Sequence, residues 1–482
     1  MRTVSSPLPD LIGPILFLDS IAPDGDAMQL AALFIQKVDA NLPPLTVNGA
    51  LCPFEEIAEY DTHKVQVARF ALPADGSGQY HWNETEYPVA GPLDRDMQIA
   101  FVSCNGEEHG DLHRAPEERN AMWARLSDQH RDRPFTLLLH GGDQVYADEA
   151  THGHPLSEDW PDTLPKDPAR ADLDSLYHHL RHKFFERYAH LYAATDFAWI
   201  AARVPSLMQW DDHDICDGWG SLQRSRTYSP VGQTLFTVAR EAYLTFQAAT
   251  REGALPERFA DPRGHHLGWQ IQTQGLRILA PDLRGQRTRR DVMGPSGWAM
   301  MEAAATAAFS GRTLLMSSVP LLGPRLSILE ALLVAVPSMQ KYEDDLRDQW
   351  QSRAHRDSWR RMLKLVLRMG EAPDQDLTVL SGEIHLATRA TLDLTDGGVL
   401  HQLVASGIAH RAPPAAWARI LGALSWLGED PLPEHPVRIR RIPGQSYRYV
   451  AERNYLVLER QGVDWSAQWD IESSGRSPAL DL

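Results

Sequence analysis

Four apolar runs in the sequence end in side chains that can bind a metal ion or transfer a proton. Each run has the length and composition of a buried strand, and the polar residues follow at its end. Carboxylates, imidazoles, a phenol and a thiol offer oxygen, nitrogen and sulfur donors to a cation. In chain order these side chains are Cys104; Asp143 and Tyr146; Asp211, Asp212 and His213; and Glu383 and His385.

The segment LLLHGGDQVYADEA, residues 137–150, contains the densest of these clusters. Gly141 and Gly142 allow a sharp backbone turn directly before Asp143. Several carboxylates gathered at one edge of a sheet would repel one another unless cations lay between them. Two cations about 3.5–4 Å apart, bridged by one carboxylate, would remove this repulsion and could hold a hydroxide and a phosphoryl group. We therefore predict that Asp143 lies between two ions and that Tyr146 approaches one of them.

From residue 97 onward, short apolar runs alternate with segments of helical spacing. This pattern predicts an α/β fold whose strands belong to a sheet covered on both faces. Ligands of open α/β sheets bind beyond the carboxyl ends of the strands, where residues far apart in sequence can meet. The predicted strands are 97–104, 135–142, 206–214, 275–284, 312–319 and 376–385, and the predicted helical segments are 119–130, 175–193, 237–250 and 358–369.

The first 95 residues show a different pattern of apolar and turn residues. Apolar or alternating runs are separated there by turn sequences such as PDGD and PADGSG, which predicts a small N-terminal β-rich domain. A catalytic domain is then expected over residues 96–482. Residues 151–172 are rich in proline and polar side chains and predict a long loop or a lid over the site.

The end of the chain predicts further strands. The sequence around Asp396-Gly397-Gly398 has the turn residues of a β-hairpin, and residues 454–471 read as a second hairpin. We expect residues 411–482 to form a C-terminal extension that adds strands beside the core.

Composition and charge restrict the class of protein. The 482 residues carry a formal net charge of −17, which argues against nucleic acid as the main partner because nucleic acids bind positive surfaces. The three cysteines show no paired spacing, so a reducing compartment fits better than a disulfide framework. Prolines interrupt the N-terminal segment, which makes it a poor signal peptide, and the apolar run at 328–337 is too short to span a bilayer. We expect a cytoplasmic protein without a membrane span. The sequence does not indicate its oligomeric state.

The motifs SCNG, GGDQVYADE, WDDHDICDGWG and SGEIH, in that order, resemble those of the PhoD-like (alkaline phosphatase D) branch of the calcineurin-like metallophosphoesterases. The segments APDLRGQRTRR (280–290) and GPSGWAMMEAAA (294–305) are similar to two further segments of that family. The resemblance extends over residues 97–410. It implies a four-layer α/β/β/α sandwich after a small β domain. It also implies a dinuclear centre with Fe³⁺ and Ca²⁺, in which other divalent metals could substitute.

The resemblance also implies a role for each candidate metal ligand. Cys104 would bind the iron, Tyr146 would bind it as a phenolate, and Asp143 would bridge both metals. His385 would bind the first metal and Glu383 the second. The chain has Gly-Glu-Ile-His where the family motif is Gly-Asp-Val-His. Glutamate reaches one methylene further than aspartate, so this departure bears on the identity and occupancy of the second metal.

The third motif supplies the remaining predicted roles. Asp212 stands where the wider superfamily has a metal-binding asparagine, and His213 stands at its catalytic histidine. Asp211 could bind a metal or orient a neighbouring ligand. Arg284 could bind the substrate phosphate through paired hydrogen bonds.

Structural roles are the alternative for three of these residues. Asp143 could cap a helix after the glycine turn. Tyr146 could pack at a strand end, and Cys104 could be a small buried residue.

Together these features predict a hydrolase of phosphate monoesters or diesters that acts on a small phosphate ester. The two ions would lower the pKa of a bound water, and the hydroxide would attack phosphorus in line. His213 would protonate the leaving group or position the substrate. A phospholipase-like or nuclease-like diesterase is a variant of this prediction. The alternative is a metal-bound scaffold or sensor with a disabled site, which Glu383 favours.

Overall fold

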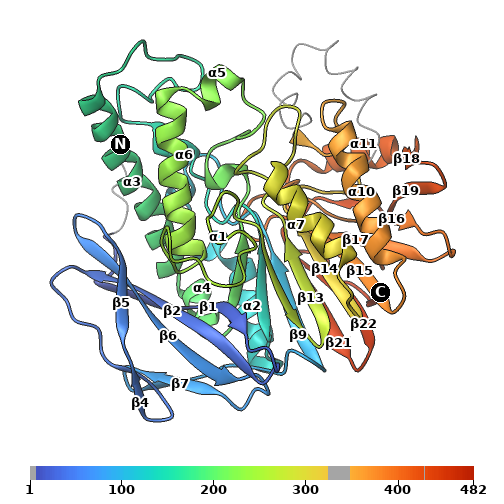
Figure 1. Cartoon of the computed structure of the whole chain (residues 1–482), viewed down its shortest axis with the longest axis horizontal. Helices are drawn as coiled ribbons and strands as arrows, with labels where there is room; N and C mark the ends of the chain where they lie inside the picture. Colours follow the sequence, from blue (N-terminus) through green and yellow to red (C-terminus); the bar gives the residue numbers. More distant parts are fainter. Residues whose placement is uncertain (1–6, 324–347, 428) are drawn as a thin grey trace.

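The computed structural model describes residues 7–323, 348–427 and 429–482, so the apolar run at 328–337 lies outside the described residues. Two large β-sheets lie face to face with helices on their outer sides (Figure 1). This arrangement confirms the predicted α/β sandwich. Within the described ranges, no helix is both long enough and apolar enough to cross a membrane.

The first sheet has eleven strands and carries three of the predicted strand ends. Its central strands β9 (Met97–Val102), β10 (Leu137–Gly141) and β11 (Ser206–Gln209) are parallel neighbours. The strand order is β23-β22-β21-β9-β10-β11-β1-β2-β6-β5, and β24 pairs with β22. The outer strands are β1 (Leu11–Ile21), β2 (Ala27–Lys37), β5 (Phe54–Glu59), β6 (His63–Pro73), β21 (Asn454–Gln461), β22 (Asp464–Ile471), β23 (Gly475–Arg476) and β24 (Leu480–Asp481).

The N-terminal strands continue this sheet. Strand β1 pairs in parallel with β11 and antiparallel with β2, so the strands of the first 95 residues join the sheet that carries the candidate site. A separate four-stranded sheet contains β4 (Ala50–Cys52), β3 (Leu45–Val47), β7 (Gln79–Trp82) and β8 (Thr85–Pro88). The domain boundary at residue 95 stays a prediction.

The second sheet carries the fourth predicted strand end. Strands β13 (Gly275–Ala280), β14 (Gly311–Ser317) and β15 (Gln375–Ser381) are parallel neighbours, and β17 (Val399–Val404) pairs in parallel with β15. The remaining strands are β12 (Trp269–Thr273), β16 (Ala387–Asp393), β18 (Glu429–Leu432), β19 (His435–Arg440) and β20 (Tyr449–Val450). The six predicted strands are therefore divided equally between two sheets, whereas the sequence pattern was consistent with a single one.

Each sheet is covered on its outer face by helices (Figure 1). Helices α3 (Arg170–Ala193) and α4 (Thr195–Ala201) contact β1 of the first sheet, α2 packs on α4, and α6 packs on α3. Helix α10 (Arg356–Gly370) contacts α7 and β15 of the second sheet. The other helices are α1 (Pro116–Arg119), α2 (Ala121–Asp132), α5 (Arg224–Thr227), α6 (Pro230–Ala242), α7 (Pro295–Thr306) and α11 (Ala415–Leu424).

The two-residue period of the strands separates two hydrophobic cores. On β13, Leu276 and Ile278 belong to the core between the sheets, whereas Leu279 packs in the core beneath the outer helices. On β14, Met316 faces the first core and Leu315 the second. Successive side chains of a strand point to opposite faces, so a strand in the middle of such a sandwich is apolar on both. This explains the continuous apolar runs in the sequence.

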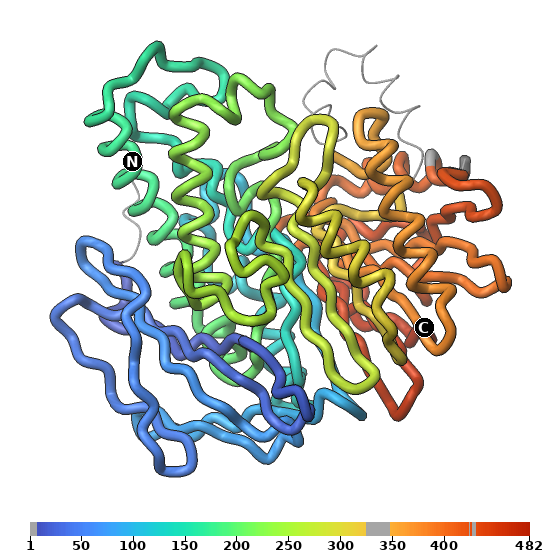
Figure 2. The backbone as a smooth tube through the Cα atoms, viewed as in Figure 1, coloured from blue at the N-terminus to red at the C-terminus, as the bar shows by residue number. Residues whose placement is uncertain are grey.

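The C-terminal hairpins form as predicted. β16 and β17 pair antiparallel around residues 396–398, and β21 and β22 pair antiparallel in the second hairpin. β21 also pairs with β9, so the end of the chain lies against its central strand, as the red and cyan tubes of Figure 2 show. Residues 152–169 contain no helix or strand, in agreement with the predicted loop. The function of this loop as a lid stays a prediction.

Candidate metal centre

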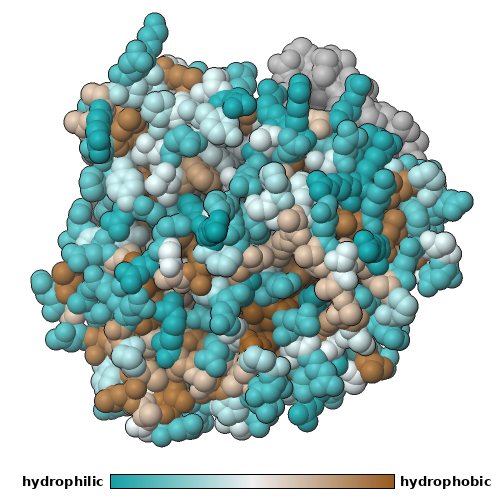
Figure 3. Space-filling model, in the orientation of Figure 1, coloured by the Kyte–Doolittle hydropathy of each residue, from teal (hydrophilic) through white to brown (hydrophobic). Residues whose placement is uncertain are grey.

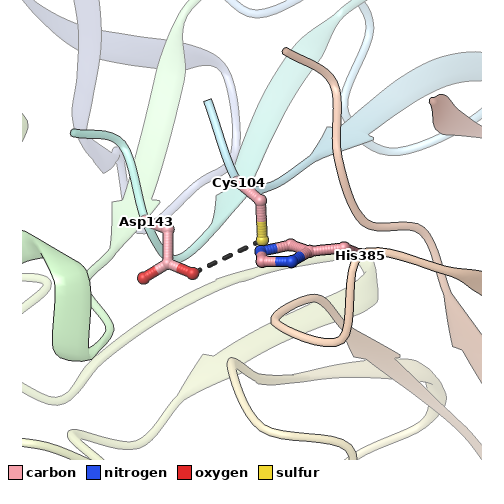
Figure 4. A group of neighbouring side chains, drawn as sticks. All are labelled: Cys104, Asp143 and His385. Carbon is pink, nitrogen blue, oxygen red and sulfur yellow. Dashed lines mark hydrogen bonds between the residues drawn. The ribbon is translucent and has the colours of Figure 1, made fainter. Parts of the chain in front are cut away.

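Three of the predicted strand ends place ligands around one point. Cys104 follows β9, Asp143 follows β10 and His385 follows β15, and one ligand atom of each lies within 4.8 Å of the others. Figure 4 shows these three side chains pointing toward one another from three segments. The Cys104 thiol donates to Oδ2 of Asp143 over 3.4 Å. The hydroxyl of Tyr146 lies 2.8 Å from Nε2 of His385, which adds a phenolic oxygen to the group.

A second group of ligands shares one member with the first. Asp143, Asp211 and Asp212 also place one carboxylate oxygen each within 4.8 Å of the others, and all three are buried. Asp143 therefore belongs both to a group with sulfur and nitrogen donors and to a group of carboxylates. This is the position expected of a carboxylate that bridges two cations.

The backbone beyond the strands fixes this convergence. The amide of Cys104 donates to the carbonyl of Gly142, and the amide of Asn105 donates to the carbonyl of Asp143, so β9 and β10 stay paired past their ends. A side chain at Gly141 would clash with Phe101, because its Cβ would lie 2.3 Å from Cζ of that ring. Gly142 has a φ of 111°, and a Cβ there would lie 2.7 Å from that of Asp211. The two glycines are needed for this close approach.

Four of the predicted ligands have a left-handed backbone conformation. The φ angles are 55° at Cys104, 54° at Asp143, 65° at Glu383 and 53° at His385. Such a conformation costs a residue other than glycine about 1–3 kcal/mol and persists where the surrounding structure imposes it. Its recurrence in four residues at three strand ends supports a functional reason for the geometry, since packing alone would favour relaxed residues there.

Each of the three buried carboxylates has an oxygen that accepts no hydrogen bond from the described residues. Burial raises the pKa of Asp143 well above its usual range, and the neighbouring charge of Asp211 raises it further. Oδ1 of Asp143, Oδ2 of Asp211 and Oδ1 of Asp212 are buried and accept no hydrogen bond from the described residues. An unpaired buried carboxylate oxygen is costly. Cations between these oxygens would satisfy all three, so the residues present fit a dinuclear centre.

The remaining donors of the first group are the Cys104 thiol, the Tyr146 phenol and the His385 imidazole. Burial raises the pKa of the Cys104 thiol, and the charge of Asp143 adds to this effect. Burial likewise raises the pKa of Tyr146. A bound cation would reverse both effects, because coordination stabilises the thiolate and the phenolate. Burial lowers the pKa of His385, which keeps its imidazole in the neutral form that binds metals.

His213 lies at the edge of the centre and is held by a carboxylate. Its Nδ1 lies 3.0 Å from Oδ2 of Asp148, and its ring centroid lies 4.3 Å from that of Tyr146. Burial alone would lower the pKa of His213, but the charges of Asp148 and Asp212 raise it well above its usual range. The protonated imidazole is therefore favoured, and Nε2 remains available to donate a proton. Asp148 also accepts from the amide of Asp217 over 2.7 Å, so the pair is fixed in position.

Arg284 faces the carboxylates of the centre. It is fully buried, with Nε hydrogen-bonded to Asp211, Nη2 3.3 Å from Oδ1 of Asp212, and Nη1 2.6 Å from Oδ2 of Asp348. The guanidinium thus offsets part of the negative charge of Asp211 and Asp212 in the second ligand group. The predicted contact between Arg284 and a substrate phosphate stays a prediction.

Replacing Arg284 by leucine should destabilise the protein strongly. The substitution leaves Asp211 and Asp212 buried without their guanidinium partner, while Asp348 keeps Arg287. Breaking one partner of a buried ion pair costs about 3–5 kcal/mol. Urea unfolding would measure the change in the free energy of unfolding. Arg289→Leu is the matched control because Arg289 is exposed in the same segment, and an exposed substitution changes stability by about 0.5 kcal/mol or less. An equal effect of the two substitutions would contradict this role of Arg284.

Glu383 lies beside the centre without joining either group. Both of its oxygens accept from Nε2 of Gln349, at 2.8 and 2.9 Å. Burial raises its pKa well above the usual range, and the charges of Asp211 and Asp348 raise it further. Its predicted contact with the second metal stays a prediction.

Several residues around the centre have no role in the sequence-based prediction. Asp148 holds His213, Ser406 contacts Cys104 and the His385 amide, and the ring of His410 stacks on that of His385 with 3.4 Å between centroids. Asp148 is part of the same motif as Asp143, so the motif itself contained the signal. Ser406 gave no signal, because a single serine after a strand is common in proteins.

Three comparisons relate the chain to known proteins. A model of the PhoD related phosphatase family matches residues 85–343, more than half of the chain. Uncharacterized protein YGR266W of Saccharomyces cerevisiae is 23% identical over 415 residues; the alignment covers 68% of this chain and 58% of that protein. The chain therefore spans less than two thirds of the length of this relative. A solved structure of PhoD superposes with a TM-score of 0.57 at 13% identity, covering 97% of this chain and 88% of that one, which shows a shared fold.

Proposed function

Because the chain belongs to the PhoD related phosphatase family, we propose that it hydrolyses phosphate esters at a dinuclear metal centre. The observation that carries this proposal is the position of Asp143, which is common to both groups of ligands. Two adjacent sites joined by a carboxylate suit the in-line displacement at phosphorus.

The donor types support a different metal in each position. Cys104, Tyr146 and His385 offer a thiolate, a phenolate and an imidazole, a set that suits iron in the ferric state. Asp211 and Asp212 offer only carboxylate oxygens, which suits a hard cation such as calcium. Other divalent metals with oxygen preference, such as manganese or magnesium, fit the second position on the same grounds.

Each residue of the centre has a separate role in the proposed reaction. When bound, the two cations supply positive charge to the phosphoryl group and acidify the water that attacks phosphorus. Asp143 would hold both cations, since it belongs to both ligand groups. His213 gives a proton to the leaving oxygen, and Asp148 keeps its ring oriented for that transfer. Arg284 offsets part of the charge of Asp211 and Asp212, which lets the two carboxylates lie close together.

Removal of the metals tests the proposal directly. We expect the metal-loaded protein to hydrolyse p-nitrophenyl phosphate or its bis ester, and we expect exhaustive chelation to reduce the rate by at least about a hundredfold. The chelated protein should also melt at a lower temperature, because cations that bind the folded state stabilise it.

Adding iron and calcium back should restore both the rate and the melting temperature, and adding calcium alone should restore neither fully. No turnover of either ester by a protein with two bound metals would contradict the proposal. An unchanged rate after verified loss of both metals would contradict it as well.

A further inference from the structure

Helix α11 presents an apolar face to solvent. Ala416, Ile420 and Ala423 are exposed and follow one another at helical spacing, and Trp426 continues the line in the short 3-10 helix Ser425–Leu427. Ile420 is 50% exposed and Trp426 is 76% exposed. The opposite face is apolar too, since Ala418 is buried. A surface helix normally places polar residues on its outer face, so this helix is apolar on the side where solvent should favour polar groups.

A tyrosine and two arginines lie beside this face. Tyr447, 55% exposed, lies in the loop before β20, and the guanidinium of Arg419 lies 5.5 Å from the centre of its ring. The guanidinium of Arg448 lies 4.9 Å from the ring of Trp426 and donates to Ser425 over 3.2 Å. Exposed aromatic rings with adjacent arginines are typical of protein surfaces that lie at a lipid interface.

The charge next to this face differs in sign from that of the whole protein. The net charge of the chain is −17. Among the residues that the structure describes, Arg419, Arg441 and Arg448 have no carboxylate within ion-pair distance, and Arg441 is exposed in the loop that leads to Tyr447. The exposed carboxylates of Asp430 and Glu434 lie on the β18–β19 hairpin and offset part of this positive charge. The remaining excess of positive charge is small and lies close to the apolar residues.

We propose that Ile420, Trp426 and Tyr447, with the arginines beside them, dock the protein on an anionic lipid bilayer. We call these residues the α11 patch. The apolar side chains would enter the boundary between headgroups and acyl chains, while Arg419 and Arg441 would contact lipid phosphates. A ten-residue helix is about 15 Å long, so its outer strip covers on the order of 150 Å². Trp426 and Tyr447 extend this strip beyond the helix. A stable dimer buries about 800 Å² on each partner, so an apolar strip of this size favours a bilayer over a second copy.

The proposed docking does not depend on the proposed hydrolysis. α11 begins five residues after His410, whose ring stacks on that of His385. A short connection therefore joins the α11 patch to a residue beside the metal centre.

Cosedimentation with vesicles tests the proposal on the full-length, metal-loaded protein. We expect binding to vesicles of phosphatidylcholine with one third phosphatidylglycerol at low salt, and weaker binding to phosphatidylcholine alone. Ile420→Asp and Trp426→Ser should each reduce the binding constant at least about tenfold. Arg419→Ala should reduce it about fivefold on anionic vesicles only. Val463→Ser is the matched control, because Val463 is 85% exposed in the turn between β21 and β22, away from the patch.

Each other outcome would overturn the proposal. Absence of vesicle binding at low salt would do so, as would equal binding by wild type, Trp426→Ser and Ile420→Asp. Light scattering would identify a second copy as the occupant: a dimer that Trp426→Ser dissociates, in a protein that does not bind vesicles, would replace the bilayer. Thermal unfolding and hydrolysis of p-nitrophenyl phosphate should be the same in wild type and Trp426→Ser, which separates loss of docking from loss of folding.

Discussion

Replacing Asp143 by alanine should abolish phosphate-ester hydrolysis and remove metal from both positions of the centre. Among the described residues, one ligand group contains Cys104 and the other contains Asp211. Asp143 is the only residue common to these two groups. Its loss therefore weakens both sites together, whereas loss of Asp212 should weaken one. We expect kcat/KM to fall at least about ten-thousandfold, since charge stabilisation and water activation are lost together. Steady-state kinetics with p-nitrophenyl phosphate and elemental analysis of the purified protein measure the two effects.

The control for this variant should share its backbone conformation. Asp374 has a φ of 60°, close to the 54° of Asp143, and is exposed at the turn before β15. Asp374→Ala should keep its activity and both metals, which separates an effect of the ligand from an effect of backbone strain. Asp143→Ala with near wild-type activity and full metal content would refute the assignment of Asp143.

Replacing His213 by asparagine should slow hydrolysis according to the leaving group. Proton transfer by a positioned side chain contributes about 10²–10⁴-fold, and it matters most when the leaving alkoxide is basic. We therefore expect a loss in kcat of at least about a hundredfold with an alkyl phosphate, and a much smaller loss with p-nitrophenyl phosphate. Metal content should not change. Asp148→Asn should cause a smaller loss of the same kind, because Asp148 acts through the imidazole.

The control is a second histidine held by an aspartate. Nδ1 of His265 lies 2.9 Å from Asp261, as Nδ1 of His213 lies 3.0 Å from Asp148, but His265 is exposed. His265→Asn should leave both rates unchanged. An equal loss with the two leaving groups would show that His213 positions the substrate and does not transfer the proton.

The strand ends were predictable because their chemistry is local. A buried strand leaves a continuous apolar run in the sequence, and the glycines and polar residues after it mark the turn; Gly141, Gly142 and Asp143 illustrate this. The local pattern could not assign the six strands to two sheets, since all six are largely buried on both faces and give the same kind of run. The pairing of β1 with β11 joins residues about 190 positions apart, and no local pattern encodes it.

The partners of the site residues were harder to predict than the residues themselves. Arg284 was expected to contact phosphate, because an arginine in a motif does not show which anion it faces. The structure gives it three carboxylates, one of which, Asp348, lies far from any motif. Gln349 contacts Glu383 from the same distant segment. These contacts depend on tertiary packing, so only coordinates could reveal them.

The role of Asp143 as a bridging ligand requires two cations, one on either side of its carboxylate. Anomalous diffraction from crystals of the metal-loaded protein, recorded at energies that distinguish iron from calcium, tests it most directly. We expect two peaks about 3.5–4 Å apart. One peak should contact Cys104, Tyr146 and His385, the other should contact Asp211 and Asp212, and both should contact Asp143. A single ion, or two ions of which one does not contact Asp143, would contradict the bridging role of Asp143.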